Sequence, residues 1–184
     1  VTLHDVLSHH RLTNELLPTS VVCWLVRQIL EGLKYAHSGA RDRRGKLLHI
    51  VHRDVSPQNM LVSMDGDVKL VAFGIAKSAL RVGQTQSGVL NGKFYYMSPE
   101  QATGETLDHR TDIFSLGIVL YELLTGELLY KDDDDITLLS KVRRADILPP
   151  SQIRPEIPPR LEQIVMKALA RDRASRYPSA QHMQ

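Results

Sequence analysis

Two side chains five positions apart, Asp54 and Asn59, are of types that can do chemistry on a phosphate group. A carboxylate can accept the proton of an attacking hydroxyl and aim that oxygen at a phosphorus atom. A neutral amide oxygen nearby can hold magnesium against the phosphates. Both residues lie in the stretch 52–59, which reads HRDVSPQN. Such a short match arises by chance often enough that it needs support from the rest of the chain.

The sequence around this stretch predicts a small β-hairpin that would position it. β-Type runs at 60–62 and 68–71 flank an Asp65-Gly66 turn, and a third run, Ile50-Val51, comes just before the stretch. Residues 74–98 show no amphipathic period and read as a long loop, which in a compact domain is usually functional or disordered.

The remaining elements read as helices. The N-terminal part, to about His37, has apolar residues at helical spacing. A helix at about 111–125 is apolar nearly all round, which places it at the centre of a domain. Thr111-Asp112 suits its N-cap, and Gly126 closes it. A further helix opens at Pro158-Pro159.

Further motifs follow Asn59 in a set order: AFG at 72–74, SPE at 98–100, DIFSLG at 112–117, and Arg176 near the end. Their order and spacing resemble the eukaryotic-like protein kinase family, in its bacterial Ser/Thr form. The resemblance implies an α+β, protein kinase-like fold: a mainly helical C-terminal lobe whose small β-hairpin carries the catalytic loop. It covers one domain, residues 1–184, with a catalytic loop at 52–59, an activation segment at 72–100 and a central buried helix at 111–125.

The resemblance also gives roles to the matching residues. Asp54 would be the catalytic base and Asn59 a magnesium ligand, while Leu61 would form the floor under adenine, resting on Val119 and Leu123. The implied cofactors are ATP and Mg²⁺, and the implied partner is a protein substrate with Ser or Thr.

Arg53, just before the catalytic aspartate, is typical of kinases that are switched by phosphorylation of the activation segment. A phosphate on Ser78, Thr85 or Ser87 could pair with this arginine, so these three are candidate acceptors.

The matching positions with a structural role are His52, Phe73, Gly74, Glu100, Asp112 and Arg176. By resemblance, His52 and Phe73 would stack in the column that links the two lobes. Asp112 would anchor the catalytic-loop backbone, and Glu100 would form a buried ion pair with Arg176.

Ala72 departs from the family pattern, because an aspartate there bridges magnesium to the β- and γ-phosphates. A methyl group cannot coordinate a metal. Metal stabilisation is worth several kcal/mol, and about 1.4 kcal/mol is tenfold in rate. The loss should therefore cost on the order of a hundredfold to ten-thousandfold in rate, unless another oxygen substitutes.

A second departure concerns two positions beside the catalytic aspartate. Ser/Thr kinases usually have a lysine where this chain has Ser56, and a threonine where it has Lys93. One hypothesis is that cation and hydroxyl have exchanged places, so that Lys93 supplies the ammonium near the γ-phosphate and Ser56 the hydroxyl. The alternative is that Lys93 is a solvated loop lysine.

No Gly-rich phosphate loop, strand lysine or partner glutamate precedes Val1, and both ends of the chain look like cuts. The resemblance therefore implies that this chain lacks the N-lobe, and the missing N-lobe of a parent chain becomes an expected partner. As given, the chain should hold one wall of the nucleotide cleft and should be inactive.

Bulk composition excludes some classes. A net charge of +2, from 23 basic and 21 acidic residues, argues against nucleic-acid binding and polybasic membrane binding. The longest apolar run, 113–124, is too short to span a bilayer, so we expect a cytoplasmic segment whose parent could still be membrane-anchored.

Three further features have simple interpretations. Cys23 lies in an apolar helical pattern and is expected to be buried and inert. The basic stretch 41–46 reads as a solvated loop, with docking of acidic partners as the alternative. The run Asp132–Asp135 reads as a solvated loop before a helix rather than a metal site.

Three functions remain open at this point: a Ser/Thr kinase lobe disabled by Ala72, a pseudokinase scaffold, or an isolated interaction fragment. Retained Asp54 and Asn59 favour the first, and Ala72 favours the second.

Overall fold

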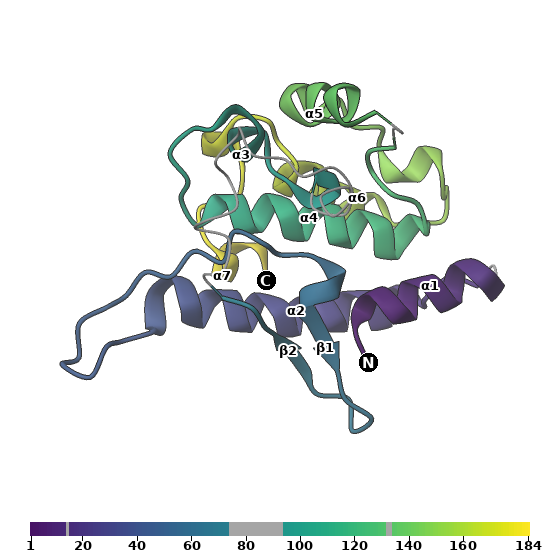
Figure 1. Cartoon of the computed structure of the whole chain (residues 1–184). Helices are drawn as coiled ribbons and strands as arrows, with labels where there is room; N and C mark the ends of the chain where they lie inside the picture. Colours follow the sequence, from purple (N-terminus) through teal and green to yellow (C-terminus); the bar gives the residue numbers. More distant parts are fainter. Residues whose placement is uncertain (14, 74–93, 132–133) are drawn as a thin grey trace.

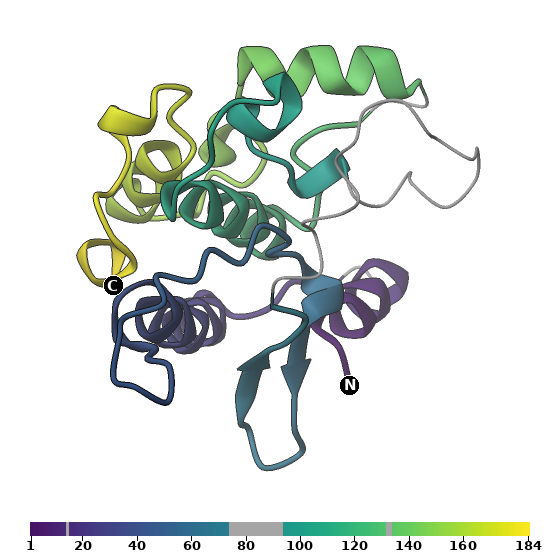
Figure 2. The same ribbon diagram turned by 60° about the vertical axis from the view of Figure 1, so that its left-hand side comes forward.

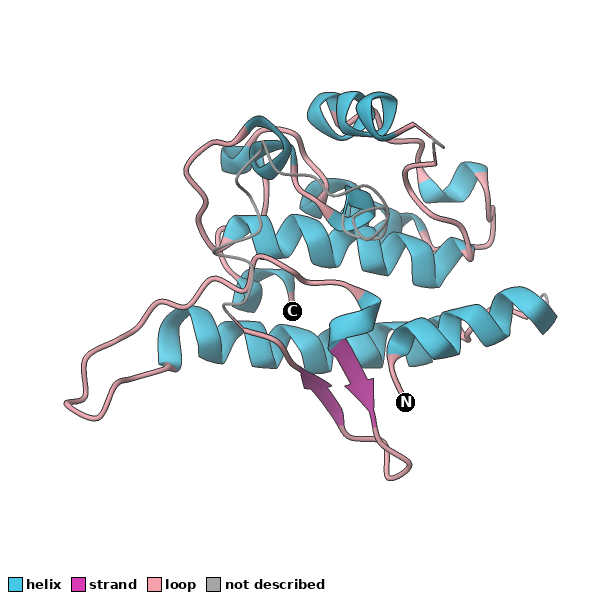
Figure 3. Ribbon diagram, in the orientation of Figure 1, coloured by secondary structure: helices cyan, strands magenta, loops and turns pink. Residues whose placement is uncertain are grey.

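A computed structural model describes residues 1–13, 15–73, 94–131 and 134–184 (Figure 1). Figure 3 shows that helices make up most of the regular structure and that strands occur in one small hairpin. The mainly helical fold with a small β-hairpin is therefore confirmed. The helices are α1 (Leu3–Thr13), α2 (Thr19–Lys34), α3 (Pro99–Thr103), α4 (Arg110–Thr125), α5 (Asp135–Arg144), α6 (Pro159–Ala168) and α7 (Ala180–Met183). The strands are β1 (Met60–Val62) and β2 (Val68–Leu70).

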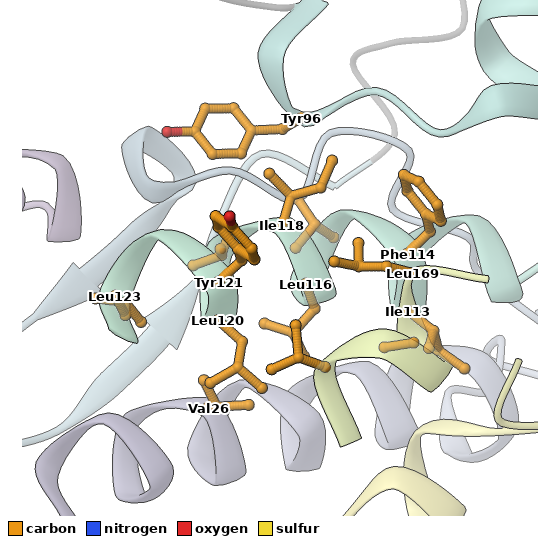
Figure 4. Close-up of a cluster of buried hydrophobic side chains, with 14 of the residues drawn as sticks. Val26, Tyr96, Ile113, Phe114, Leu116, Ile118, Leu120, Tyr121, Leu123 and Leu169 are labelled. Carbon is orange, nitrogen blue, oxygen red and sulfur yellow. The ribbon is translucent and has the colours of Figure 1, made fainter. Parts of the chain in front are cut away.

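Helix α4 forms the centre of the molecule. Every residue from Thr111 to Thr125 is buried, as expected for a helix with no polar face. In Figure 4, Leu120 extends from α4 toward Val26 on α2, while Tyr96 lies across the opposite side of the helix. Helix α6 also packs against α4. The helix ends at Gly126, whose φ of 75° is the left-handed conformation that glycine adopts at low cost.

Helix α2 buries the apolar stripe that its spacing predicts, including Val22, Leu25, Ile29 and Leu33. The prediction that Cys23 is buried was wrong, because this residue is exposed. One residue along a helix turns the side chain by about 100°, so the neighbour of a buried residue can lie outside the stripe.

The hairpin carries the polar loop 52–59 at its start. Strands β1 and β2 pair antiparallel, with Leu61 opposite Lys69, and Gly66 turns between them with a φ of 89°. Ile50-Val51, predicted as a strand, forms none. Thr2 makes a β-bridge to Leu61, so the start of the chain runs along the outer edge of β1.

Asp134 and Asp135 are the described residues of the acidic run, and they lie at the start of α5. The Asp134 carboxylate accepts a hydrogen bond of 2.8 Å from the Thr137 backbone N–H and so caps the helix. Among the described residues, no group of three or more His, Cys, Asp or Glu is placed to hold a metal. Within the same residues, no helix has the length and apolar character needed to cross a membrane.

Two glycines in helices give a matched test of this packing. A methyl group on Gly117 would lie 3.0 Å from Leu169 Cδ2 and 3.1 Å from Ala168 Cβ, whereas one on Gly32 would meet nothing within 4 Å. We expect Gly117→Ala to lower the free energy of unfolding by about 1–3 kcal/mol through overpacking. Gly32→Ala should raise it by about 0.5–1 kcal/mol, because alanine favours the helix. Urea denaturation of both variants measures this, and a stabilised Gly117→Ala would contradict the close α4–α6 contact.

Candidate active site

The buried carboxylate of Asp112 holds the backbone of the polar loop 52–59. Its two oxygens accept hydrogen bonds from the backbone N–H groups of His52, at 2.8 Å, and Arg53, at 2.7 Å. Arg53 has a φ of 69°, a left-handed conformation that costs a non-glycine residue energy. These hydrogen bonds offset that cost, so Asp112 on α4 determines the shape of a loop about sixty residues earlier in the chain.

His37 also binds Asp112 and was missed from the sequence. Its Nε2 lies 2.7 Å from Asp112 Oδ2, and both side chains are buried. The ring follows the end of α2, where a single histidine gives no signal of its partner. Asp112 thus links the end of α2, the polar loop and the start of α4.

Asp54 and Asn59 are brought together by the loop. The Asn59 side-chain N–H donates a hydrogen bond of 2.8 Å to the backbone oxygen of Asp54. Within the described part of the chain, the Asp54 carboxylate has no hydrogen-bond or ion-pair partner. A half-buried carboxylate without a partner is available to accept a proton, and the bonded amide leaves the Asn59 oxygen available as a ligand.

His52 packs against Phe73 and hydrogen-bonds the chain next to it. The two ring centroids are 4.5 Å apart with an interplanar angle of 63°. The His52 Nε2 lies 2.8 Å from the backbone oxygen of Val71. Residues 71 and 73 are therefore both tied to His52, on either side of Ala72.

Ala72 has a φ of 67°, again in the left-handed region. Asp and Asn visit this region more readily than other non-glycine residues, whereas alanine pays about 1–2 kcal/mol. The backbone at Ala72 therefore has the form that an aspartate would adopt more easily, although its methyl group offers no metal ligand.

Glu100 and Arg176 form a buried, two-pronged ion pair. Their nitrogen and oxygen atoms lie 2.6 and 2.8 Å apart, and Thr111 donates a further hydrogen bond of 2.7 Å to Glu100. Burial by itself would raise the pKa of the Glu100 carboxyl, but the hydrogen bonds from Arg176 and Thr111 outweigh it and hold that pKa below its ordinary value.

Comparison with known proteins identifies the family of this chain. The protein kinase domain family matches residues 1–184. The chain belongs to the protein kinase family. Similar relatives are tyrosine-protein kinase MasK of Myxococcus xanthus (40% identical over 165 residues) and serine/threonine-protein kinase PknB of Mycolicibacterium smegmatis (43% over 136 residues). A third is serine/threonine-protein kinase PknL of Mycobacterium tuberculosis, 37% identical over 164 residues.

The matches cover 90%, 73% and 89% of this chain, but only 25%, 22% and 39% of MasK, PknB and PknL. The chain therefore spans well under half the length of these relatives.

A contact between the polar loop 52–59 and the segment after residue 93 was also missed. Ser98 and Gln101 form a capping box at the start of α3. The Gln101 side-chain N–H also donates a hydrogen bond of 2.8 Å to the backbone oxygen of Arg53. The Ser-x-x-Gln spacing in the kinase sequence could have revealed the capping box, but not the bond to Arg53.

A second missed group surrounds Glu122, a buried carboxylate of α4. Tyr96 donates a hydrogen bond of 2.6 Å to it, and the guanidinium of Arg11 on α1 forms an ion pair with it. Burial raises the pKa of Glu122, although Tyr96 and Arg11 both act to lower it. This group joins α1 to the kinase segment at 94–98.

The remaining kinase positions are partly described. Ser56 is buried. Leu61 on β1 is 39% exposed, whereas Val119 and Leu123 are buried. The other predicted positions, Gly74, Ser78, Thr85, Ser87 and Lys93, lie outside the described residues.

The Glu100–Arg176 pair gives a stability prediction with a defined pH dependence. Glu100→Ala leaves the buried Arg176 charge unpaired and should cost about 3–5 kcal/mol of unfolding free energy at pH 7. Because the folded pKa of Glu100 lies below its ordinary value of 4.5, its contribution is present above pH 4.5 and is lost as pH falls through the folded pKa.

Urea denaturation between pH 3 and pH 7 measures both effects. The matched control is Glu105→Ala, which removes an exposed ion pair with Arg173 and should cost less than about 1 kcal/mol. An equal loss in both variants, or an unchanged acid profile in Glu100→Ala, would contradict the assignment.

Proposed function

We propose that this chain is the large lobe of a protein kinase catalytic domain that transfers the ATP γ-phosphate to protein Ser or Thr hydroxyls, and that Ala72 strongly lowers this activity. The observation that carries the proposal is the Asp54 carboxylate, which has no partner among the described residues and belongs to a loop fixed by Asp112. Asn59 in the same loop bonds the Asp54 backbone oxygen. A catalytic base needs a free carboxylate at a fixed place.

In this proposal Asp54 accepts the proton of the substrate hydroxyl and orients its oxygen toward the γ-phosphorus. The amide oxygen of Asn59 would hold one Mg²⁺, and this metal would supply positive charge near the phosphates. The residues present fit this metal only in part, because Ala72 supplies no oxygen where a second ligand is needed. Leu61 would contact the adenine ring from below.

The nucleotide site also needs residues that this sequence does not contain, since none of its glycines forms a Gly-x-Gly-x-x-Gly loop. We therefore propose that a second, N-terminal lobe completes the cleft. The exposed apolar surfaces of Leu61 and Phe73, each 39% exposed, are consistent with a surface that such a lobe covers.

Ser/Thr preference is a further proposal. Two of the named relatives are serine/threonine-protein kinases and one is a tyrosine-protein kinase. Regulation through Arg53 is consistent with its side chain, because its buried Nε has no partner among the described residues. A phosphate on Ser78, Thr85 or Ser87 would supply the missing acceptor.

The second candidate is a pseudokinase that acts by binding other proteins, and Ala72 is the observation that favours it. A kinase lobe without this metal ligand could keep its fold and lose its turnover. The two candidates differ in what restoring the aspartate should do.

In the full two-lobed protein, Ala72→Asp should raise γ-phosphate transfer on the order of a hundredfold to ten-thousandfold, because it restores a metal ligand. Radioactive phosphate transfer to a protein substrate, with and without the change, measures this. Ala72→Gly is the matched control: it relieves the left-handed strain without adding an oxygen and should leave turnover low.

The gain should disappear when Asp54→Asn is added, since the proton acceptor is then gone. If Ala72→Asp gives no transfer while the protein stays folded, the pseudokinase is supported instead.

The proposed exchange of Ser56 and Lys93 has its own test in the Ala72→Asp background. Lys93→Met should lower turnover on the order of tenfold to a hundredfold, because it removes a cation near the γ-phosphate. The swap Ser56→Lys with Lys93→Thr should keep turnover near the level before the change. Unchanged turnover in Lys93→Met would refute the exchange and identify Lys93 as a solvated lysine.

A further inference from the structure

The basic stretch between α2 and the catalytic loop is an ordered hairpin, here called the basic hairpin (residues 41–47). Arg41 and Leu47 form a β-bridge, and the Leu48 backbone N–H donates a hydrogen bond of 2.9 Å to the Ala40 oxygen. Figures 1 and 2 both show this segment projecting from the end of α2, away from the helical body. The basic hairpin is therefore a structured protrusion.

The one acidic residue of the hairpin is used to shape it. The Asp42 carboxylate accepts hydrogen bonds from the backbone N–H groups of Arg44, at 2.8 Å, and Lys46, at 2.9 Å. Arg41 donates a hydrogen bond of 2.7 Å to the oxygen of Gly45, whose φ of 80° suits glycine at this turn. The tip is thus fixed by its own side chains.

The base of the hairpin is fixed as well. The Ile50 backbone N–H donates a hydrogen bond of 2.9 Å to the Ala36 oxygen. The His49 Nδ1 lies 3.0 Å from the His37 backbone oxygen, which places this junction next to the His37–Asp112 pair. Both ends of the protrusion are therefore anchored to the framework that holds the catalytic loop.

Three cations at the tip remain available. Arg43, Arg44 and Lys46 are exposed, and their side chains make no ion pair or hydrogen bond with the rest of the described chain. Among the other described arginines, Arg110 pairs with Asp108 at 2.7 Å, whereas the exposed Arg160 and Arg171 make no ion pair. A solvated loop does not need this order, whereas a binding site gains from it, because a fixed loop loses less entropy when a ligand binds.

We propose that the basic hairpin docks an acidic segment of a partner protein, rich in Asp and Glu. The guanidinium groups of Arg43 and Arg44 can each make two parallel hydrogen bonds to a carboxylate. With Lys46 they place three positive charges on one short turn, which suits a short run of Asp and Glu side chains. Basic clusters that recognise membranes lie next to a membrane-spanning helix or on an amphipathic helix, whereas the four basic residues of the basic hairpin lie on a turn. The net charge of +2 does not favour nucleic acid. This inference concerns a partner surface and does not depend on the proposed phosphate transfer.

The test measures fluorescence anisotropy of a labelled peptide with six consecutive glutamates, mixed with the full protein at low salt. A peptide with glutamines in their place is the neutral probe and should not bind. Arg43→Glu with Arg44→Glu should weaken binding of the acidic peptide tenfold or more. The matched control, Arg160→Glu with Arg171→Glu, makes the same change in net charge at two exposed arginines elsewhere and should weaken binding less than threefold.

Asp42→Ala separates a shaped site from simple charge attraction. It makes the hairpin more positive, so net charge alone predicts tighter binding. Loss of the two hydrogen bonds to its carboxylate predicts a looser tip and weaker binding, by about threefold or more, which is the result we expect.

The proposal is overturned if the acidic peptide does not bind, if the control pair weakens binding as much as the hairpin pair, or if Asp42→Ala tightens it. Binding to phosphatidylserine vesicles that depends on Arg43 and Arg44, without binding of the peptide, would also overturn it in favour of a membrane surface. Circular dichroism of each variant confirms that the protein is folded.

Discussion

The buried carboxylate of Asp112 is the interaction on which the geometry of the site depends. An isolated charge at this depth would be costly, and it is tolerated because the N–H groups of His52 and Arg53 and the ring of His37 all face it. The same donors hold Arg53 in its left-handed form, which turns the chain so that Asp54 follows. Asp112 lies at a well-defined position because α4 is buried on all sides, and close packing opposes displacement of a buried helix.

A second path joins the same loop to the C-terminal part of the molecule. Arg176 binds Glu100, and Glu100 accepts from Thr111, the residue just before Asp112. One residue after Glu100, Gln101 donates to the backbone oxygen of Arg53. Asp112 on α4 thus holds two backbone N–H groups of the loop, and Gln101 on α3 holds one of its backbone carbonyls. Two separate attachments restrict the loop more than either alone, and Asp54 in its proposed role as base needs such a fixed position.

The sequence predicted the elements well and the polar contacts unevenly. The sequence located α4 because a helix buried on every side is apolar at nearly every position, and this pattern is visible without knowing what packs against it. Gly126 marked its end. The same reasoning failed for Cys23, where one step along the helix leads out of the buried stripe. The contacts of His37, Gln101 and Arg11 were missed because their partners lie far away in the sequence. The residues around a polar side chain do not indicate which distant group tertiary packing will place next to it. The contacts of Asp112 and Glu100 were predicted only through resemblance to a family in which such distant partners are known.

Ala72 shows that positioning and metal binding are separate properties of this site. Its left-handed backbone is not explained by its own side chain, since alanine disfavours that region. The neighbours supply the reason: the oxygen of Val71 is bonded to His52, and the ring of Phe73 packs against the same histidine. The neighbours on both sides therefore impose the backbone conformation at residue 72, and it is present even though alanine has no carboxylate oxygen. The backbone at Ala72 therefore keeps a conformation that suits an aspartate, and what the chain lacks at this position is the carboxylate itself.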